Sequence, residues 1–483
     1  MAASSGSNLR TSGNPICYGD VDGDGQPELV CSTVDGMGNR GLLYVWNLDG
    51  SLEAGFPIVL LGGSGRRMSL GDLDEDGVLD IVTVPRDYPE GYVQVLHGDG
   101  SAVPGWPRQL DTHPGSAAAI GDITGDGSVE LVVESVDSIF AFDRIGNVLW
   151  SFTLPGTFSF SYSSPVLVDL DGDGVREVVF GCHEQGSPHA GRVYVVSGPD
   201  GSDLPGWPQD TLDWVFAPVA IGDLDQDGGL DLVVGDLGEG HVYAWRVDGT
   251  LLPGFPIAGV DSVYDQVTLA DLDGDGSVEL MFDGNVARNG FGRYYGYNHD
   301  GTVMDGWPLT PWGMSISNMA CAADFDGDGM LDVMGSTQSD ATGVFITRVY
   351  SWQANVPFTP HLSYSTMRQY NPRHDGVFRM PDVTSVPEGS VTSHPLRVVP
   401  NPFEERVSVS WSNQMSSGDA GSLFDVRFYD SGGRQVRSLT SLGTSQVTWD
   451  GSDDSGRALP SGVYLCRARS GEAETSSTIV LRR

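Results

Sequence analysis

The sequence predicts an all-β fold in which a seven-bladed β-propeller is followed by a small β-sandwich. Seven copies of one acidic motif begin at residues 20, 72, 122, 169, 223, 271 and 324, so the repeat is about fifty residues long. Each copy lies between short apolar runs, such as residues 166–168 and 178–180. A regular period of this length with strand–loop–strand signals is typical of a propeller. After about residue 396 the repeat ends and segments of alternating polarity begin.

Each copy of the motif places oxygen-bearing side chains at its first, third, fifth and ninth positions and glycine at its sixth. The backbone carbonyl at the seventh position can supply a further oxygen. The expected metal ligands, copy by copy, are Asp20, Asp22, Asp24, Gln26, Glu28; Asp72, Asp74, Asp76, Val78, Asp80; Asp122, Thr124, Asp126, Ser128, Glu130; Asp169, Asp171, Asp173, Val175, Glu177; Asp223, Asp225, Asp227, Gly229, Asp231; Asp271, Asp273, Asp275, Ser277, Glu279; and Asp324, Asp326, Asp328, Met330, Asp332.

Alternate carboxylates on a short loop converge on one point, and calcium takes about six to eight oxygen ligands. The glycine permits the left-handed backbone that the turn requires. Carboxylates clustered in this way repel one another unless a cation lies between them. The motif therefore predicts about seven structural calcium ions, with the weakest site in the third copy, where Thr124 replaces an acid. The alternative is a set of acidic hairpin turns that bind nothing.

An EF-hand loop begins in the same way but ends on a bidentate glutamate at its twelfth position. No copy has an acid at that position, and the flanking runs are too short and too β-branched for helices. The twelfth residues are Cys31, Thr83, Val133, Phe180, Val234, Phe282 and Gly335. EF-hand and dockerin-type loops are therefore not expected.

A third strand, an Asp-Gly turn and a fourth strand are expected after each motif, as in residues 243–249. Five units then reach an aromatic-Pro pair whose proline lies 15 or 16 residues before the next motif. This constant phase predicts one four-stranded unit per repeat, with the aromatic ring packed between blades. The pairs are Phe56-Pro57, Trp106-Pro107, Trp207-Pro208, Phe255-Pro256 and Trp307-Pro308, whereas the third unit has Trp150 and Pro155 instead.

The string Asp-x-Asp-x-Asp-Gly-x-x-Asp/Glu between strands, repeated seven times, resembles the FG-GAP/VCBS repeat family. The resemblance covers residues 14–365 and implies a seven-bladed, integrin-α-like propeller with calcium in the blade hairpins. The family includes adhesins, lectins, polysaccharide lyases and scaffolds, so the resemblance implies the fold and the metal sites far better than the function.

Residues 366–395 are rich in turn formers and are predicted to form a linker. Residues 396–483 contain short strands of alternating polarity about ten residues apart, which is typical of an Ig-like sandwich. The strings 399–403, 407–411, 447–451 and 461–465 resemble the Ig-like domain of flagellar hook-capping proteins and the related sorting domains of bacterial type IX secretion. That resemblance implies export across an outer membrane through dedicated machinery, followed by surface attachment or release.

The formal net charge of −39 opposes nucleic acid and anionic membranes as partners. No segment is long and apolar enough for membrane insertion, and residues 1–13 contain no hydrophobic signal. Because calcium loops suit an extracellular setting, we expect a secreted or cell-surface protein whose signal peptide has been removed. The chain has 5 cysteines, of which Cys17 and Cys31 flank the first motif, so a cross-strand disulfide between them is an open question.

Chain direction places the acidic loops and the Asp-Gly turns on one face of the propeller. The opposite rim is therefore the expected surface for an extracellular protein or glycan, because aromatic rings stack on sugars. Its candidate residues are Arg66, Arg67, His113, Tyr162, Trp214, Tyr264 and Trp312. Ordinary loop packing is the alternative.

No nucleophile elbow, zinc-protease helix or phosphate loop occurs in the sequence, so no catalytic residue can be named. The favoured interpretation is a calcium-stabilised binding protein that serves adhesion, surface assembly or glycan recognition and carries a C-terminal secretion or anchoring module. The alternatives are a calcium-dependent polysaccharide lyase or glycoside hydrolase on the same propeller, and a structural surface-layer or filament subunit.

Overall fold

The computed structural model describes most of the chain, with gaps at both termini and in several loops. The described residues are 16–34, 41–61, 65–85, 91–110, 116–159, 163–186, 189–238, 240–286, 290–315, 319–340, 345–380, 396–399, 406–411, 423–429, 435–442, 446–460, 462–470 and 473–481. They form two compact units. The first comprises residues 1–323 and 330–383, and the second comprises residues 324–329 and 384–483.

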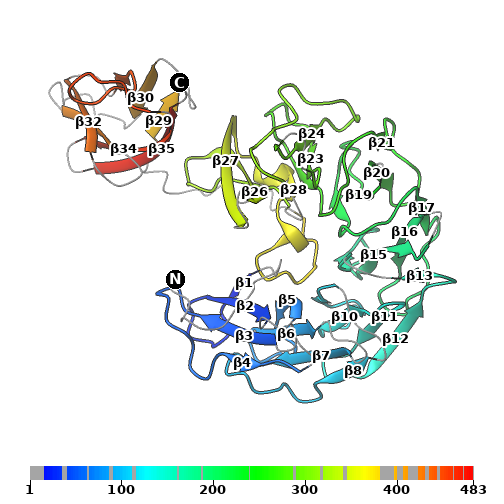
Figure 1. Ribbon diagram of the computed structural model, residues 1–483. Coiled ribbons are helices and arrows are strands. Elements are labelled where there is room, and N and C mark those ends of the chain that lie inside the picture. Colours follow the sequence, from blue (N-terminus) through cyan, green and yellow to red (C-terminus); the bar gives the residue numbers. More distant parts are fainter. Residues whose placement is uncertain are drawn as a thin grey trace. The chain divides into compact units, whose positions relative to one another are not determined.

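The first unit is a β-propeller whose described strands form seven sheets, arranged in chain order around residues 360–378 (Figure 1). The first four sheets contain β1 (Cys17–Gly19), β2 (Glu28–Val34), β3 (Gly41–Trp46), β4 (Ile58–Val59); β5 (Gly65–Gly71), β6 (Asp80–Pro85), β7 (Gly91–Leu96), β8 (Arg108–Leu110); β9 (Ala119–Gly121), β10 (Glu130–Glu134), β11 (Ser138–Phe142), β12 (Val148–Thr153); and β13 (Phe158–Ser159), β14 (Val166–Val168), β15 (Glu177–Glu184), β16 (Gly191–Val196), β17 (Gln209–Thr211).

The last three sheets differ in how they are completed. They contain β18 (Ala220–Gly222), β19 (Asp231–Gly235), β20 (His241–Arg246), β21 (Ile257–Ala258); β22 (Thr268–Ala270), β23 (Glu279–Asp283), β24 (Tyr294–Tyr297) with β28 (Ser363–Ser365); and β25 (Cys321–Ala323), β26 (Met330–Asp340), β27 (Phe345–Pro357). The sixth sheet thus takes its fourth strand from a distant part of the chain, and the described part of the seventh has three strands.

Within each sheet the strands before and after the acidic motif pair antiparallel, as the apolar runs predicted. In the fourth sheet the register places Val166 opposite Val179 and Val168 opposite Glu177. Strands of these sheets are buried on both faces, which explains their continuous Val, Leu and Ile content. In six sheets the ninth residue of the motif begins the strand that follows the acidic loop, and in all seven this residue is buried.

Hydrophobic packing joins each sheet to the next. Six clusters of buried side chains each combine residues of two consecutive sheets, for example Leu73 and Val82 of the second with Ile120 and Val133 of the third. Among the described residues, no such cluster joins the seventh sheet to the first. In the part of the chain that the structure describes, six hydrophobic interfaces therefore hold consecutive sheets together.

The tryptophans at the ends of the repeats anchor neighbouring sheets, as predicted. Trp106 and Trp207 donate their indole N–H groups to the carbonyls of Arg144 and Val247 in the following sheet, at 3.1 and 2.7 Å. Trp150, which departs from the repeat pattern, does the same to Gly198 at 2.6 Å. The five predicted aromatic-Pro pairs all have cis peptide bonds.

Backbone segments of adjacent sheets approach closely on the face that carries the acidic loops. A Cβ atom on Gly98, in the Asp-Gly turn of the second sheet, would lie 1.8 Å from the carbonyl oxygen of Val21 in the first acidic loop. A Cβ atom on Gly198 would likewise lie 2.4 Å from the carbonyl oxygen of Ile123. Glycine is required at both turns because no side chain fits. Since the turns lie this close to the acidic loops, the turns and the loops share one face of the propeller.

Residues 360–378, here called the axial segment, lie at the centre of the propeller (Figure 1). The segment contains η1 (Pro360–Leu362), β28 and η2 (Arg368–Tyr370). In every described sheet, its backbone or side chains bond to the strand that precedes the acidic loop or to the residue just beside that strand. The donor and acceptor pairs are Tyr18–Pro372, Leu70–Arg373, Ile120–Asp375, Leu167–Gly376, Tyr370–Val219, Asp271–Leu362 and Ala322–Thr366.

The start of the segment that we predicted as a linker, residues 366–395, thus includes part of the axial segment. Pro, Asn and Gly favour turns, so the composition that predicted a linker also suits a segment that turns repeatedly as it passes from one strand edge to the next. Residues 381–395 lie outside the described part of the chain.

The second unit consists of two antiparallel sheets. One contains β29 (Leu396–Val399), β30 (Val407–Trp411) and β33 (Gln446–Trp449), and the other β31 (Leu423–Tyr429), β32 (Gln435–Leu442), β34 (Gly462–Ser470) and β35 (Ala473–Leu481). Buried side chains from both sheets form one core around Trp449, whose ring stacks on Phe428 with centroids 4.3 Å apart. An Ig-like topology for this unit stays a prediction.

The first motif carries no disulfide between Cys17 and Cys31. The register places Cys17 opposite Val30, so Cys31 falls on the other face of the sheet. Cys17 instead donates its thiol to the carbonyl of Met68, with a sulfur–oxygen distance of 3.3 Å. In the described part of the chain, no helix has the length and apolar character needed to cross a membrane.

Candidate metal centres

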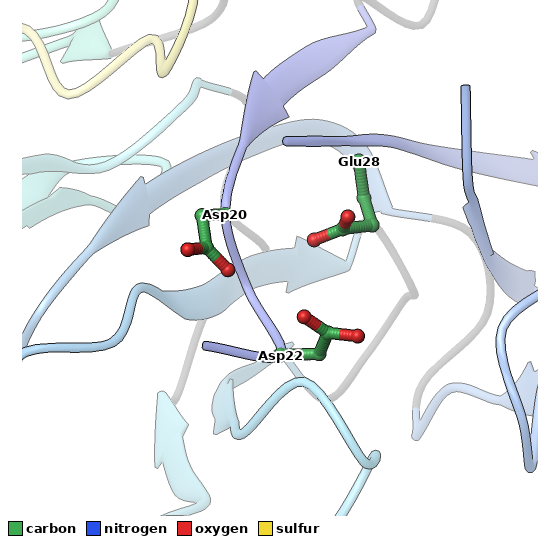
Figure 2. Close-up of side chains that lie close together, drawn as sticks. All are labelled: Asp20, Asp22 and Glu28. Atoms are coloured by element: carbon green, nitrogen blue, oxygen red, sulfur yellow. The ribbon is translucent and has the colours of Figure 1, made fainter. Parts of the chain in front are cut away.

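The first acidic loop, between β1 and β2, gathers its carboxylates around one space (Figure 2). Both oxygens of Asp20 accept backbone N–H groups, at 2.8 and 2.9 Å. One oxygen of Asp22 and one of Asp24 each accept the N–H two residues further on, at 3.0 and 2.7 Å. Glu28 reaches back to the N–H of Val21 at 3.0 Å. The loop backbone therefore fixes each carboxylate and leaves further oxygens available inside.

The glycine at the sixth position has the same role in the other loops. Its φ lies between 78° and 93° in all seven copies, a conformation that favours glycine. In six copies its N–H donates to the first aspartate of the loop, at 2.9 to 3.1 Å. These pairs are Gly25–Asp20, Gly77–Asp72, Gly127–Asp122, Gly174–Asp169, Gly228–Asp223 and Gly329–Asp324.

The ninth-position acid of every loop is buried, with at most 6% of its surface exposed. In six loops one of its oxygens accepts the N–H of the second residue, at 2.7 to 3.0 Å. These pairs are Val21–Glu28, Leu73–Asp80, Ile123–Glu130, Leu170–Glu177, Leu224–Asp231 and Leu272–Glu279. The sequence placed these acids at the start of a strand but did not indicate that they are almost completely desolvated.

In the first six loops, burial raises the pKa of the ninth-position acid, and the neighbouring carboxylates of the same loop raise it further. The pKa reaches about 6 for Asp80, about 7 for Glu177 and Asp231, and about 8 for Glu279. Keeping such a buried acid ionised beside other carboxylates costs free energy. A bound cation would offset both the desolvation and the repulsion.

Carboxylate oxygens of one loop approach one another closely enough to share an ion. In the first, second, fourth, fifth and sixth loops, one oxygen from each of the first, third and ninth residues lies within 4.8 Å of the others. In addition, Asp74 Oδ1, Thr124 Oγ1 and Asp223 Oδ1 are buried without a hydrogen-bond partner, and all three belong to predicted ligand residues. An all-oxygen set of this kind suits a hard cation.

Two loops contain an extra basic side chain from the following turn. His97 Nδ1 lies 3.0 Å from Asp80 Oδ1 and 4.0 Å from Asp74 Oδ2 in the second loop. Arg246 pairs with Asp225 and Asp227 in the fifth loop. The sequence pattern did not single out either residue, although both occupy the same place before an Asp-Gly or Asp-Gly-like turn.

The seventh loop repeats the local geometry of the others. Asp324 accepts backbone N–H groups from Gly327, Asp328 and Gly329, at 2.8 to 2.9 Å. Met330 and Asp332 begin β26. The residues of this loop therefore adopt the predicted turn.

On the opposite rim, aromatic side chains of the fourth, fifth and sixth sheets contact one another. Trp214 lies 4.4 Å from His189, 5.1 Å from His183 and 5.7 Å from Phe216 between ring centroids, and Phe216 meets Tyr264 edge-on at 5.7 Å. The indole nitrogen of Trp214 is buried without a hydrogen-bond partner. Two predicted rim residues thus share one cluster, which we call the aromatic rim: His183, His189, Trp214, Phe216 and Tyr264.

Of the other predicted rim residues, the structure describes the side chains of Trp312 and Arg67, which are not part of this cluster. Trp312 is 40% exposed and lies under the guanidinium of Arg348, 3.9 Å from its ring centroid. Arg67 is half-buried and donates to Ser164 at 3.4 Å. His113, Tyr162 and the side chain of Arg66 fall outside the described residues.

Arg67 belongs to a polar group near the axial segment. Its positive charge lowers the pKa of the buried carboxyls of Glu134 and Asp265, although burial dominates and raises both, the latter to about 6. Asp265 also forms an ion pair with Arg368 of the axial segment. Buried charges of this kind are stable only when paired, so these contacts hold the axial segment against the sheets.

Comparison with protein families finds two kinds of module in the chain. Residues 20–83, 72–133 and 223–282 match the FG-GAP-like repeat. Residues 397–482 match the secretion system C-terminal sorting domain, which indicates type IX secretion, localisation at the cell surface or outside the cell, and interaction with the secretion machinery. Both matches confirm the resemblances that the motifs carried.

Solved structures similar to the chain include propellers and surface proteins at low sequence identity. A rhamnogalacturonan lyase of Bacillus licheniformis has 16% identity and a TM-score of 0.44, over 70% of this chain and 64% of the lyase. The Dos1 propeller has 11% identity and a TM-score of 0.39, over 71% and 82%. The V. cholerae biofilm matrix protein Bap1 has 13% identity and a TM-score of 0.34, over 97% and 66%. The chain thus spans slightly under two thirds of the lyase and of Bap1. A search of curated proteins found no match.

Proposed function

Because the chain carries FG-GAP-like repeats and a secretion-system sorting domain, we propose that it is an extracellular or surface-attached binding protein stabilised by calcium. The acidic loops bind the calcium, and the aromatic rim binds an extracellular glycan or protein. The loops serve stability, and the rim serves recognition.

The observation that carries the calcium assignment is the buried ninth acid of each loop. A carboxylate that is at most 6% exposed and surrounded by other carboxylates is unfavourable without a countercharge. The remaining donors are carboxylates, one threonine hydroxyl and backbone carbonyls, all of them hard oxygen ligands. Calcium accepts such flexible oxygen sets at about 2.3–2.6 Å, whereas magnesium demands a stricter octahedron.

Binding to several loops stabilises the propeller by mass action. A site whose ligand is present at ten times its dissociation constant adds about 1.4 kcal/mol. Several such sites together rival the whole stability of a typical domain, about 5–15 kcal/mol. Calcium would therefore decide whether the sheets are ordered and would perform no chemistry.

The aromatic rim supports the recognition role. Trp214 lies beside His183 and His189, and Tyr264 meets Phe216 edge-on, so the cluster offers several aromatic rings on which a sugar can stack. Sugars offer both an apolar face and hydroxyl groups, so a glycan fits this chemistry.

The first test is a thermal melt of the full chain with calcium and with excess EDTA, together with a count of bound calcium by elemental analysis. We expect several calcium ions per chain and a melting temperature that falls by tens of degrees in EDTA. An unchanged melt with little bound calcium would overturn the calcium assignment. A screen of immobilised glycans in calcium then tests the rim independently.

A further inference from the structure

The fifth acidic loop differs from the other described loops because an arginine pairs with two of its carboxylates. The guanidinium of Arg246 pairs through Nη2 with Asp225 Oδ2, and its Nε lies 3.5 Å from Asp227 Oδ2. Asp225 and Asp227 are the third- and fifth-position carboxylates of the motif. One side chain of this protein therefore bridges two of the groups that would otherwise face a metal ion.

The neighbouring sheets show what normally occupies this place. Arg246 begins a turn in which its N–H donates to the carbonyl of Thr250, at 2.9 Å. Five other sheets have the same turn, closed by the same kind of bond. The first residues of those turns are Asn47, His97, Asp143, Ser197 and Asn298. Among these described turns, only the fifth begins with arginine.

The asparagines at this place turn away from the acidic loop. Asn47 donates its side-chain amide to Ser51 and Glu53, at 3.1 and 3.0 Å, and Asn298 donates to Thr302 at 2.8 Å. Both amides thus stay within their own turn, and the first and sixth loops keep their carboxylates for another partner. Arginine is longer and charged, so it reaches the loop instead.

We propose that Arg246 takes the place of calcium in the fifth loop, so that this loop remains metal-free while the asparagine-type loops bind the ion. This inference rests on the calcium function proposed above. A guanidinium keeps its charge at every physiological pH and forms directional bonds to carboxylates. It is also tethered beside the loop, so a calcium ion must displace it before both carboxylates are available.

The rest of the fifth loop retains the features of a metal site. Asp231 is 2% exposed and bonds to the N–H of Leu224 at 2.8 Å, as its counterparts do. Asp223 Oδ1 is buried without a hydrogen-bond partner. Removal of the guanidinium should therefore leave a loop that can accept calcium.

Calcium titration of the metal-stripped full chain tests this by two opposite substitutions. Arg246→Asn copies the turn residue of the first and sixth sheets, and we expect it to bind one calcium ion more than the unmodified chain. Asn298→Arg copies the fifth sheet, and we expect it to bind one ion fewer. Arg192→Asn removes an arginine that pairs with Asp210 outside any acidic loop, at 2.6 Å, and should leave the count unchanged.

Isothermal titration calorimetry gives the number of sites, and elemental analysis after gel filtration checks it. Arg246→Gln serves as a second variant should the asparagine disturb the turn. An unchanged count in both Arg246 variants, with calcium bound to the unmodified chain, would overturn this inference and leave the calcium function standing. Failure of every variant to bind calcium at millimolar concentration would overturn the calcium function and this inference together.

Discussion

Leu272 donates its backbone N–H to Glu279 Oε2 at 2.7 Å, and this bond holds a buried carboxyl group at the centre of the sixth acidic loop. Glu279 is 1% exposed, and burial followed by the charges of nearby aspartates raises its pKa to about 8. The same relationship recurs between the second and ninth residues of five further loops. The metal-free propeller must therefore carry either extra protons or uncompensated charge.

The stability of the calcium-free protein should fall as pH rises from about 4.5 to about 8. A carboxyl whose pKa is raised by folding binds its proton more tightly in the folded state, so its contribution to stability is complete below its unfolded pKa and is lost as pH passes the folded value. The relevant acids are Asp80, Glu177, Asp231 and Glu279. Thermal melts of metal-stripped protein from pH 5 to 8.5 measure this trend.

Calcium should bind with release of protons at pH 7, since in the fourth and sixth loops it replaces protons on Glu177 and Glu279. Titrations in buffers of different ionisation enthalpy count the protons released. Glu279→Gln should release fewer of them. A calcium-free protein that becomes steadily more stable from pH 5 to 8 would contradict this account of the buried acids.

Gly98→Ala should strongly destabilise the propeller, by more than about 3 kcal/mol, because the new methyl group meets the carbonyl oxygen of Val21. Gly50→Ala is the matched control in the first sheet. Gly50 has a φ of 86° and nothing within 4 Å of the added Cβ, so only the backbone conformation is penalised, by about 1–2 kcal/mol. Melting temperatures in saturating calcium compare the two, and equal shifts would show that the turn can move away from the acidic loop.

Arg368→Met should destabilise the propeller by about 3–5 kcal/mol, because it removes the guanidinium that forms an ion pair with the buried carboxyl group of Asp265. The double variant Arg368→Met with Asp265→Asn removes both charges and should recover part of the loss. Melts of the single and double variants at pH 7 provide the measurement. If the double variant were no more stable than the single one, the ion pair would not be what holds the axial segment.

Trp214→Ala should weaken glycan binding by up to about tenfold, since one aromatic stacking contact is worth about 0.5–1.5 kcal/mol. Leu212→Ala alters a nearby side chain that is 66% exposed and should leave binding unchanged. Binding to the best glycan of the screen, measured in calcium, compares the two variants. Equal affinities would place the ligand elsewhere on the molecule.

The repeat structure could be predicted from the sequence because the motif, the Asp-Gly turn and the aromatic-Pro pair recur in a constant phase. The acidic loops followed from the alternation of carboxylates, and Trp106 and Trp207 were correctly expected between sheets. These features depend on local sequence alone, so a single chain displays them.

Other features depend on contacts between distant residues. Nothing in residues 360–378 indicates that they bond to the strands that precede the acidic loops, because all of those bonds except that of the Tyr370 hydroxyl join backbone groups. The aromatic rim draws on loops of three different sheets, and Phe216 joins it from an irregular segment without a strand pattern. Arg246 could have been noticed by aligning the turns of the repeats, where it replaces asparagine or another small polar residue.

The axial segment also sets the order in which this chain can finish folding. The backbone N–H of Tyr18 in the first sheet donates to the carbonyl of Pro372. This bond cannot form until the chain that follows the seventh sheet has been synthesised. Such distant pairings are slow to form, and N-terminal parts of a nascent chain otherwise fold as they emerge. Until the segment arrives, the innermost strand of each completed sheet presents an unprotected edge, which is where strands of other molecules add. The period of greatest risk of aggregation for this protein is therefore the interval between synthesis of the first sheet and synthesis of residue 378.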